Sequence, residues 1–231
     1  MTAGPTMDRL DQAQAVISAL FDVPVAVGVT DPRVPQPATL EGEAAHLVQA
    51  LASRQQEFAA GRTAVRIAMA QLGMAPVAIP AAKDRAPVWP SGLRGSISHT
   101  KFLCAAVVAN EGPSLGLDIE QNTPLSSGLL STICSDAEQR HIAGPDQLRL
   151  AKLVFSAKEA IYKAQYPLTK MLFGFDHIDI FFNLPARAFT ATFLKPAGYF
   201  AVGDKLQGRF DEIDGHLVTA AWADKSLSKG A

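Results

Sequence analysis

The chain has 231 residues and a mass of 24.5 kDa, with 21 basic and 22 acidic residues and a net charge of −1 at pH 7. Its 48% of hydrophobic and 19% of charged residues exclude an intrinsically disordered chain, and the length fits between one and two domains. The near-neutral charge argues against nucleic acid or a membrane as partner, and no apolar run approaches the roughly 20 residues of a membrane helix.

The first half of the chain predicts helix, strand, long helix, loop and further strands. Residues 23–29 form a short Val-rich strand that ends at Asp31-Pro32. Residues 41–72, rich in Ala, Leu, Glu and Gln, predict a long helix with a bend at Gly61. Four prolines make residues 75–94 a loop, and residues 96–109 and 115–120 predict strands separated by a turn.

The second half predicts helices over 129–142 and 146–165, split by Gly144-Pro145, and strands over 177–182, 189–194 and 216–223. Helices and strands do not strictly alternate. An α+β chain of two similar-sized lobes therefore fits better than a doubly wound sheet.

Charge is distributed unevenly along the sequence. Residues 54–101 contain seven basic and two acidic side chains, whereas residues 111–146 contain six acidic side chains and one basic, Arg140. Opposed regions of this kind suit a polyanionic ligand that carries a metal ion. Scattered, solvated charged faces are the alternative.

Two carboxylates stand close together in Gly116-Leu117-Asp118-Ile119-Glu120. On a strand, Asp118 and Glu120 share one face, roughly 7 Å apart at their α-carbons, while the intervening residues face the core. Neighbouring carboxylates repel each other, and a bound cation or plentiful water keeps both ionised. Taken alone, such a pair is more often a solvated strand end than a metal site.

The helix that follows supplies a third carboxylate. Apolar residues recur at helical spacing from Leu150 to Ala164 and form one stripe. Another face of the helix carries Lys152, Ser156, Glu159 and Lys163. Glu159 and Lys163 could form an ordinary i,i+4 pair on a surface helix. Alternatively, Glu159 completes a three-oxygen Mg²⁺ site for phosphate-anhydride chemistry with the strand carboxylates, and Lys158 and Lys163 neutralise phosphate charge.

Hydroxyl groups and a histidine lie together in Gly95-Ser96-Ile97-Ser98-His99-Thr100. Ser98 and His99 are neighbours on a strand and point to opposite faces, which argues against a serine hydrolase. The segment suits hydrogen bonding to an anion. Alternatively, His99 is a structural residue whose hydrogen bonds are made within the protein. No Walker-type or G-x-G-x-x-G loop is present, so phosphates would bind through arginine, lysine and metal.

The order of these motifs resembles the 4′-phosphopantetheinyl transferases. The pair that carries the resemblance is Gly116-Leu117-Asp118-Ile119-Glu120 and, about 35 residues later, Phe155-Ser156-Ala157-Lys158-Glu159-Ala160-x-x-Lys163. Similar segments are Arg54-x-x-Glu57-Phe58-x-x-Gly61-Arg62-x-x-x-Arg66, Trp89-Pro90, Gly95-Ser96-Ile97-Ser98-His99, Tyr166-Pro167-Leu168-Thr169-Lys170 and Gly174-Phe175. Together they cover roughly residues 50–180, and the downstream segments are similar to the subgroup that serves siderophore, nonribosomal-peptide and polyketide pathways.

The resemblance implies a fold and a reaction. The fold is an α+β pseudo-dimer of two similar lobes in one chain, residues 1–112 on the coenzyme A nucleotide side and residues 113–231 with the metal site. The active site lies in the cleft between them. The reaction transfers the 4′-phosphopantetheine arm of coenzyme A to a serine of an apo acyl or peptidyl carrier protein and releases adenosine 3′,5′-bisphosphate.

The resemblance also implies residue roles. Asp118, Glu120 and Glu159 hold Mg²⁺, for which Mn²⁺ could substitute, and Arg54, Arg62, Lys83, Arg85, Ser98 and His99 contact the adenine and 3′-phosphate side. Lys158 and Lys163 bind phosphate oxygens. Glu159 is the candidate general base, directly or through a water molecule, and Lys163 is the candidate acid; the sequence does not separate these roles.

Two other classes of function stay open from the sequence: a metal-dependent phosphohydrolase or nuclease with the same carboxylates, and a nucleotide-binding module without catalysis. Cys104 and Cys134 form neither a metal spacing nor a disulfide framework, and no signal-peptide pattern opens the chain. We therefore expect a monomeric cytoplasmic protein with reduced thiols.

Overall fold

The computed structural model describes residues 8–44, 47 and 50–224, so the expectation about the N-terminal end lies outside the described residues. Within that range the helices are α1 (Arg9–Ala19), α2 (Ala52–Gln71), α3 (Leu130–Ile133), α4 (Asp136–His141) and α5 (Gln147–Thr169). The strands are β1 (Ala26–Thr30), β2 (Arg94–His99), β3 (Cys104–Ala109), β4 (Ser114–Gln121), β5 (Ile178–Asn183), β6 (Ala188–Phe193), β7 (Lys205–Ile213) and β8 (His216–Ala223). No helix among the described residues is both long and apolar enough to cross a bilayer.

The strands form two antiparallel sheets, which confirms the α+β class. The first has the order β1-β3-β2 and the second the order β4-β8-β7-β6-β5. Their edge strands β2 and β4 meet through serine hydroxyls: Leu117 N–H donates to Ser96 Oγ (3.0 Å) and Ile119 N–H to Ser98 Oγ (3.1 Å). These bonds satisfy buried backbone donors of an edge strand without a continuous main-chain ladder.

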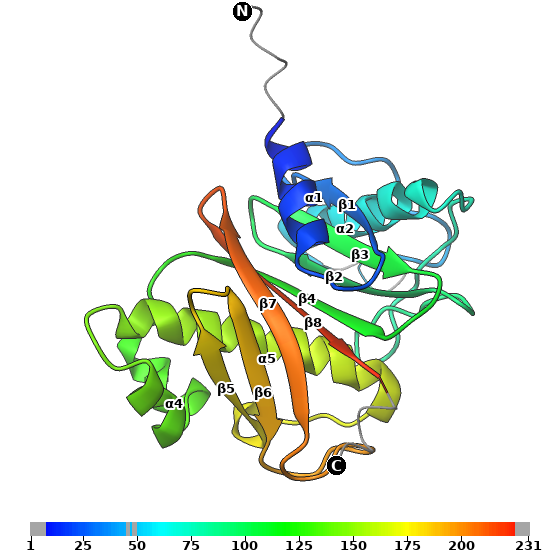
Figure 1. Ribbon diagram of the computed structural model, residues 1–231. Helices are drawn as coiled ribbons and strands as arrows, with labels where there is room; N and C mark the ends of the chain where they lie inside the picture. Colours follow the sequence, from blue (N-terminus) through cyan, green and yellow to red (C-terminus); the bar gives the residue numbers. More distant parts are fainter. Residues whose placement is uncertain (1–7, 45–46, 48–49, 225–231) are drawn as a thin grey trace, which may run out of the picture.

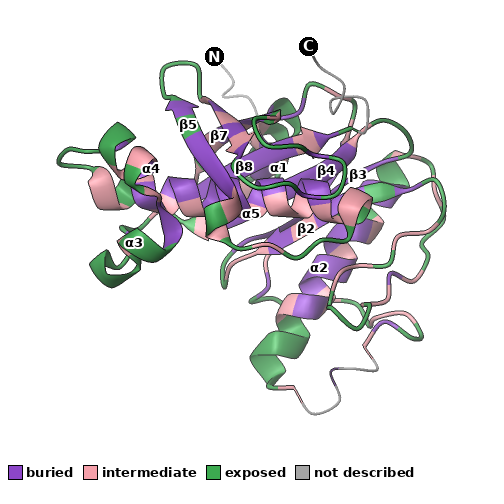
Figure 2. Ribbon diagram, turned by 90° about the horizontal axis from the view of Figure 1, so that it is seen from below, coloured by how far each residue is buried: buried purple, intermediate pink, exposed green. Residues whose placement is uncertain are grey.

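Helices cover both faces of the paired sheets (Figure 1). Helix α1 packs on one face, and its residue Ile17 shares a core with Phe21, which follows the helix, and with strands of both sheets. On the opposite face, α2 packs against the three-stranded sheet and α5 against the five-stranded one. Strands β3, β4 and β8 between these layers are almost wholly buried, whereas the beginning of α2 is exposed (Figure 2).

The two helices on that face approach their strands at glycines. A Cβ at Gly28 in β1 would lie 1.9 Å from the carbonyl oxygen of Ala64 in α2. A Cβ at Gly116 in β4 would lie the same 1.9 Å from the carbonyl oxygen of Ala160 in α5. Only glycine permits so close an approach between strand and helix backbones, and each half of the chain uses it once.

A buried glutamate anchors each of these helices in the same way. Glu43 accepts hydrogen bonds from Leu40 N and Ile79 N and pairs with Arg66 of α2 (3.1 Å). Glu138 accepts from Ser135 N and Ile180 N and pairs with Lys158 of α5 (2.8 Å). Both glutamates are fully buried, and each joins the segment before a helix to a cation of that helix.

The structure confirms most predicted elements and corrects several boundaries. The strand expected over 96–109 is the hairpin β2–β3, because Thr100 Oγ1 accepts from the backbone of Phe102 and Leu103 and closes a turn. The helix expected over 129–142 breaks into α3 and α4, since Ser135 forms a capping box with Glu138 and starts a new helix.

The long first-half helix begins later than expected and is continuous. Helix α2 starts at Ala52 rather than 41, and residues 45–46 and 48–49 of the predicted segment lie outside the described residues. Gly61 makes no break, because its bare face lies against Ile97 of β2. Strand β7 was not predicted at all.

Candidate functional site

The paired carboxylates of β4 face helix α5, as their spacing predicts. Leu117 and Ile119 point into the core beneath α1, so Asp118 and Glu120 lie on the opposite face of the strand. Helix α5 packs over that face and carries Glu159, which is half-buried. The structure therefore brings strand and helix carboxylates to the same layer between β4 and α5.

Asp118 is buried among hydrogen-bond donors. Its Oδ1 accepts from Lys163 Nζ (2.7 Å) and Ser98 Oγ (3.0 Å), and its Oδ2 accepts from Ser156 Oγ (2.8 Å). Glu120, two residues on, pairs with Lys152 Nζ at 3.2 Å. Each strand carboxylate thus has its own ammonium group from α5.

The carboxylates repel one another across this layer. Burial, the larger cause, raises the pKa of Glu159, and the charges of Asp118 and Glu120 raise it further, while Lys163 opposes the shift. Burial also raises the pKa of Glu120, again with a contribution from Asp118. A group of carboxylates whose ionised forms disfavour one another is a group that a divalent cation would stabilise.

The carboxylate oxygens therefore fit a hard cation such as Mg²⁺. In this structure, however, the three carboxylates are not gathered around one point. Among residues 8–44, 47 and 50–224, no three Asp, Glu, His or Cys side chains form a group that could hold a metal ion. Asp118 already accepts hydrogen bonds from Lys163, Ser98 and Ser156. A metal ion at Asp118 would compete with these donors for the lone pairs of the carboxylate.

A basic cavity of about 440 Å³ lies beside α2 and the end of β2. Four residues expected to contact a nucleotide line it: Arg54, Arg62, Arg85 and His99. Arg54 Nη1 donates to His99 Nε2 (3.1 Å), and Glu57 lies 3.8 Å from His99 Nδ1. The cavity is therefore positively charged and sized for a small anionic ligand.

Arg62 is an unusual side chain in this cavity, because it is only 5% exposed and its Nε has no hydrogen-bond partner. Its guanidinium stacks over the ring of Phe58 at 4.1 Å. Burial lowers the pKa of Arg62 to about 10. A buried guanidinium with an unsatisfied donor at a cavity wall is a ready partner for an anion.

Burial also lowers the pKa of His99, and the nearby Arg54 and Lys163 lower it further against the opposing charge of Glu57. His99 is therefore mainly neutral near pH 7 in the free chain. An anion placed beside it would reverse part of this shift.

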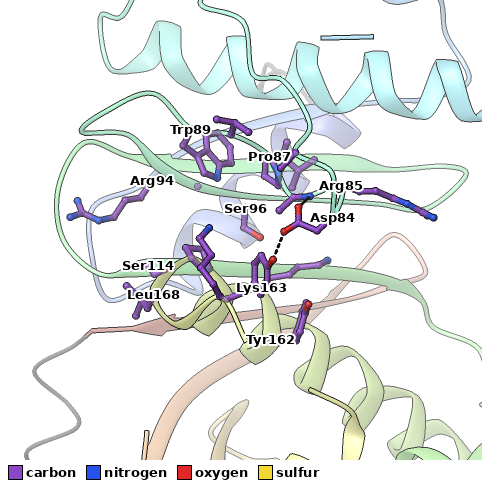
Figure 3. Close-up of a pocket in the computed structure, with 18 of the residues that line it drawn as sticks. Asp84, Arg85, Pro87, Trp89, Arg94, Ser96, Ser114, Tyr162, Lys163 and Leu168 are labelled. Atoms are coloured by element: carbon purple, nitrogen blue, oxygen red, sulfur yellow. Dashed lines mark hydrogen bonds between the residues drawn. The ribbon is translucent and has the colours of Figure 1, made fainter. Parts of the chain in front are cut away.

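A second, aromatic cavity of about 620 Å³ lies between the loop 82–89, strand β2 and helix α5 (Figure 3). Trp89, Tyr162 and Tyr166 line it, with Lys163 in its wall. The loop reaches α5 through a hydrogen bond from Tyr166 Oη to Asp84, drawn as a dashed line in Figure 3. That bond raises the pKa of Tyr166 to about 12.

The two cavities adjoin each other. Arg85, Pro87 and Ile97 line both of them. Arg85 has a positive φ of 69°, a conformation that non-glycine residues adopt rarely. A long ligand with an anionic end in the basic cavity could therefore continue past Arg85 into the aromatic cavity.

Three residues with expected phosphate or nucleotide roles lie elsewhere. Lys158 is 2% exposed, and its Nζ donates to Ile133 O, Glu138 Oε2 and Phe175 O, which uses all three of its hydrogens. Ser98 is buried between β2 and β4, where its hydroxyl bonds to Asp118 and Lys163. Lys83 is exposed in the loop and lines neither cavity. Lys158 therefore has the contacts of a structural anchor, because the three hydrogens of its ammonium group are all donated within the protein.

Sequence reasoning gave no role to several residues that shape the site. Ser156 holds the second oxygen of Asp118, and Tyr162 and Tyr166 stack on each other (5.6 Å between ring centroids) in the aromatic cavity. The i,i+4 spacing of the two tyrosines on one helix face was an available signal. The serine was placed on the helix face of Glu159 and Lys163, but its contact with Asp118 could not be predicted because that partner lies 38 positions away in the sequence.

Two family models match the chain in succession. The model described as 4′-phosphopantetheinyl transferase N-terminal domain matches residues 42–109, and the model described as 4′-phosphopantetheinyl transferase superfamily matches residues 114–221. The junction between the matches falls immediately before β4, where the two sheets meet.

Curated relatives agree with these models. The 4′-phosphopantetheinyl transferase Svp of Streptomyces mobaraensis is 37% identical over 189 residues, 77% of this chain and 76% of that protein. The 4′-phosphopantetheinyl transferase PptT of Mycobacterium tuberculosis is 35% identical over 159 residues, 67% of this chain and 70% of that protein. Enterobactin synthase component D of Salmonella typhi is 36% identical over 132 residues, which covers 55% of this chain and 54% of that protein.

Proposed function

Because the chain belongs to the 4′-phosphopantetheinyl transferase superfamily, we propose that it moves the phosphopantetheine arm of coenzyme A onto a serine of an apo acyl or peptidyl carrier protein. Adenosine 3′,5′-bisphosphate is the second product. The reaction depends on Mg²⁺ or Mn²⁺.

One arrangement supports this proposal above others. The basic cavity adjoins the aromatic cavity at Arg85, and the aromatic cavity adjoins the carboxylate layer at Lys163. Coenzyme A has a part for each of the three: a phosphorylated nucleotide for the basic cavity, a long, weakly polar arm for the aromatic cavity and a pyrophosphate for the carboxylate layer. A phosphohydrolase would need the carboxylates and the basic cavity but not the adjoining aromatic one.

The nucleotide is held by the basic cavity. Arg62 offers a buried guanidinium, and Arg54 and His99 add two further donors that can turn toward a 3′-phosphate. The pantetheine arm occupies the aromatic cavity against Trp89 and Tyr162. Binding energy gathered along both cavities positions the pyrophosphate at the carboxylate layer, where the chemistry occurs.

The residues of the carboxylate layer carry the transfer. Asp118, Glu120 and Glu159 would hold the divalent cation, which supplies charge neutralisation at the pyrophosphate oxygens. The serine oxygen forms a bond to the β-phosphorus while the bond to the bridging oxygen breaks. Glu159, whose pKa is raised by burial, takes the serine proton directly or through a water molecule, and Lys163 donates a hydrogen bond to the departing phosphate.

Glu159 is accessible for this role. It lines a small cavity of about 160 Å³ beside Phe173 and Phe175, so its side chain reaches a space outside the core. A carrier serine that enters this cavity meets Glu159 without passing through the nucleotide site.

We also propose that the chain is a pseudo-dimer of lobes 1–112 and 113–231 with the site at their junction. The repeated glycine contacts of Gly28 and Gly116 and the repeated anchors Glu43 and Glu138 support it. The resemblance to siderophore-type relatives favours a cytoplasmic monomer that serves siderophore or other secondary-metabolite synthesis.

Incubation with coenzyme A, Mg²⁺ and an apo carrier protein, followed by mass spectrometry of the carrier, tests the function. We expect a mass gain of one phosphopantetheine group, abolished by a chelator and by Asp118→Asn or Glu159→Gln. Release of phosphate without a change in carrier mass would indicate a hydrolase, and neither change would indicate a binding module. Circular dichroism of both variants checks that the loss of transfer is not a loss of folding.

A further inference from the structure

The ammonium group of Lys163 lies against the carboxylate that the proposed metal site needs. Its Nζ is 2.7 Å from Asp118 Oδ1, 3.0 Å from Leu117 O and 3.1 Å from Ser98 Oγ. The Asp118 side chain is 6% exposed and that of Lys163 is 26% exposed. A partly buried ion pair of this kind is screened little by salt.

In the free chain, Lys163 and Ser98 donate to one oxygen of Asp118. Ser156 donates to the other oxygen, so three of the roughly four lone-pair positions of the carboxylate already accept a hydrogen bond. A second positive charge at Asp118 would also lie close to the ammonium group and be repelled by it.

The ammonium group of Lys163 can also turn toward the aromatic cavity. It belongs to the wall of the aromatic cavity, which adjoins the basic cavity through Arg85. An anion at the boundary between cavity and carboxylate layer would offer the ammonium group a new partner. A flexible four-carbon stem allows this exchange without movement of α5.

We propose that Lys163 is an internal competitor for the divalent cation at Asp118, and that the pyrophosphate of coenzyme A releases the competition by drawing the ammonium group away. This inference rests on the proposed function and adds to it an order of binding. The free chain binds the metal weakly, and coenzyme A makes the binding tight. By linkage, the metal raises the affinity for coenzyme A by the same factor.

Titration with Mn²⁺, followed by the electron paramagnetic resonance signal of the free ion, tests the competition without turnover. The folded protein is titrated at one fixed pH with and without coenzyme A, in the absence of carrier protein. For the unchanged chain we expect coenzyme A to tighten Mn²⁺ binding by a factor between about 5 and 150, the usual range for coupled sites. Lys163→Met should bind Mn²⁺ tightly without coenzyme A and show most of that coupling lost.

Matched variants distinguish direct competition at Asp118 from the general effect of removing one positive charge near the site. Lys170→Met removes one positive charge from the same cavity wall without touching Asp118, and should leave both constants within about twofold. Lys163→Arg keeps a cation beside Asp118 and should behave as the unchanged chain does. Lys163→Gln is the second neutral variant if Lys163→Met is poorly folded.

Mn²⁺ binding by the neutral Lys163 variants that is no tighter than that of the unchanged chain would overturn the competition. Equal coupling in the unchanged chain and in Lys163→Met would overturn it as well. The carrier assay is run alongside: normal transfer with either of these results refutes only the competition. No transfer together with no Mn²⁺ binding in the presence of coenzyme A refutes the proposed function too.

Discussion

The Arg62 side chain is desolvated in the folded chain without full compensation. It is buried, its Nε lacks a hydrogen-bond partner, and the resulting loss of hydration lowers its pKa to about 10. A buried, unsatisfied donor costs roughly 1–3 kcal/mol. A residue that destabilises the free protein but lines a cavity is typical of a binding site, where the ligand supplies what the fold does not.

We therefore expect Arg62→Met to act in opposite directions on stability and on binding. Methionine keeps the packing over Phe58 and removes the buried charge, so the free energy of unfolding in urea should rise by about 1 kcal/mol. The KM for coenzyme A should rise at least about tenfold, and the KM for 3′-dephospho-coenzyme A should change much less. Equal effects on both donors would contradict a contact with the 3′-phosphate.

His99 makes binding of coenzyme A dependent on pH. Burial holds the pKa of the free histidine below its usual 6.5, and a phosphate beside it would raise that pKa. Between the two values the complex binds more protons than the free protein, so affinity should increase as the pH falls through the raised pKa and level off below the lowered one. Calorimetry in two buffers of different ionisation enthalpy should show proton uptake near pH 6.5 that His99→Gln reduces. Equal uptake by both proteins would remove His99 from the phosphate contact.

At the scale of elements, the alternation of apolar and polar residues predicted which face of β4 carries its carboxylates. Five residues of β4 placed Asp118 and Glu120 on the face that α5 covers, because a strand has a period of two and its intervening leucine and isoleucine needed the core. Strand β7 was missed because Gly208 stands at one of its inward positions and weakens the apolar alternation. Its bare face accommodates Phe189, a contact that no local pattern reveals.

The partners of charged side chains could not be predicted from helix faces. Lys158 and Lys163 lie five positions apart on α5, and both were expected at phosphates. The structure buries Lys158 against Glu138 and leaves Lys163 beside Asp118. The difference depends on what α4 and β4 bring to each side of the helix, which is set by tertiary packing rather than by the sequence of α5.

The anchoring role of Lys158 predicts a large loss of stability without a binding defect. Lys158→Met leaves the carboxylate of Glu138 buried and unpaired, which should lower the free energy of unfolding by about 3–5 kcal/mol. Urea denaturation measures the loss, and titration of the folded variant with coenzyme A should give nearly the affinity of the unchanged chain. Weakened binding at unchanged stability would instead return Lys158 to the phosphate site.

The close approach of strand and helix makes Gly116 sensitive to a single methyl group. Gly116→Ala would set a Cβ 1.9 Å from the carbonyl of Ala160, so α5 must shift away from β4. We expect a loss of at least about 1–3 kcal/mol in the free energy of unfolding, and reduced transfer, because Glu159 moves with the helix. Gly128→Ala is the matched control, because a Cβ at that position meets no atom within 4 Å. The free energy of unfolding of this variant should differ from that of the unchanged chain by less than about 0.5 kcal/mol. Similar losses for both variants would refute the close-approach explanation.

At the scale of the whole molecule, two sheets share one core although each has its own helix on the opposite face. Ile17 of α1 and Phe21 just after it are buried against residues of β1 and β3 from one sheet and of β4 and β8 from the other. The seam between β2 and β4 is closed by the hydroxyls of Ser96 and Ser98. The two proposed lobes therefore share a core, and we expect that they are not independent folding units.

We expect the chain to unfold in a single cooperative transition and its halves to fail to fold alone. A 231-residue chain that melts as one unit should have an unfolding enthalpy of about 160 kcal/mol near 60 °C, with calorimetric and van 't Hoff values in agreement. The separate segments 1–112 and 113–231 expose the core beneath α1, so each should lack the near-ultraviolet dichroism of packed aromatic side chains, and mixing them should restore it. Two resolved transitions in the calorimeter, or a segment that is folded by itself, would contradict this expectation. Either result would show that the core beneath α1 contributes less to the free energy of unfolding than the cores beneath α2 and α5. The proposed site between the proposed lobes would then be held together only by the contact of β2 with β4, and ligand binding rather than folding would have to fix its geometry.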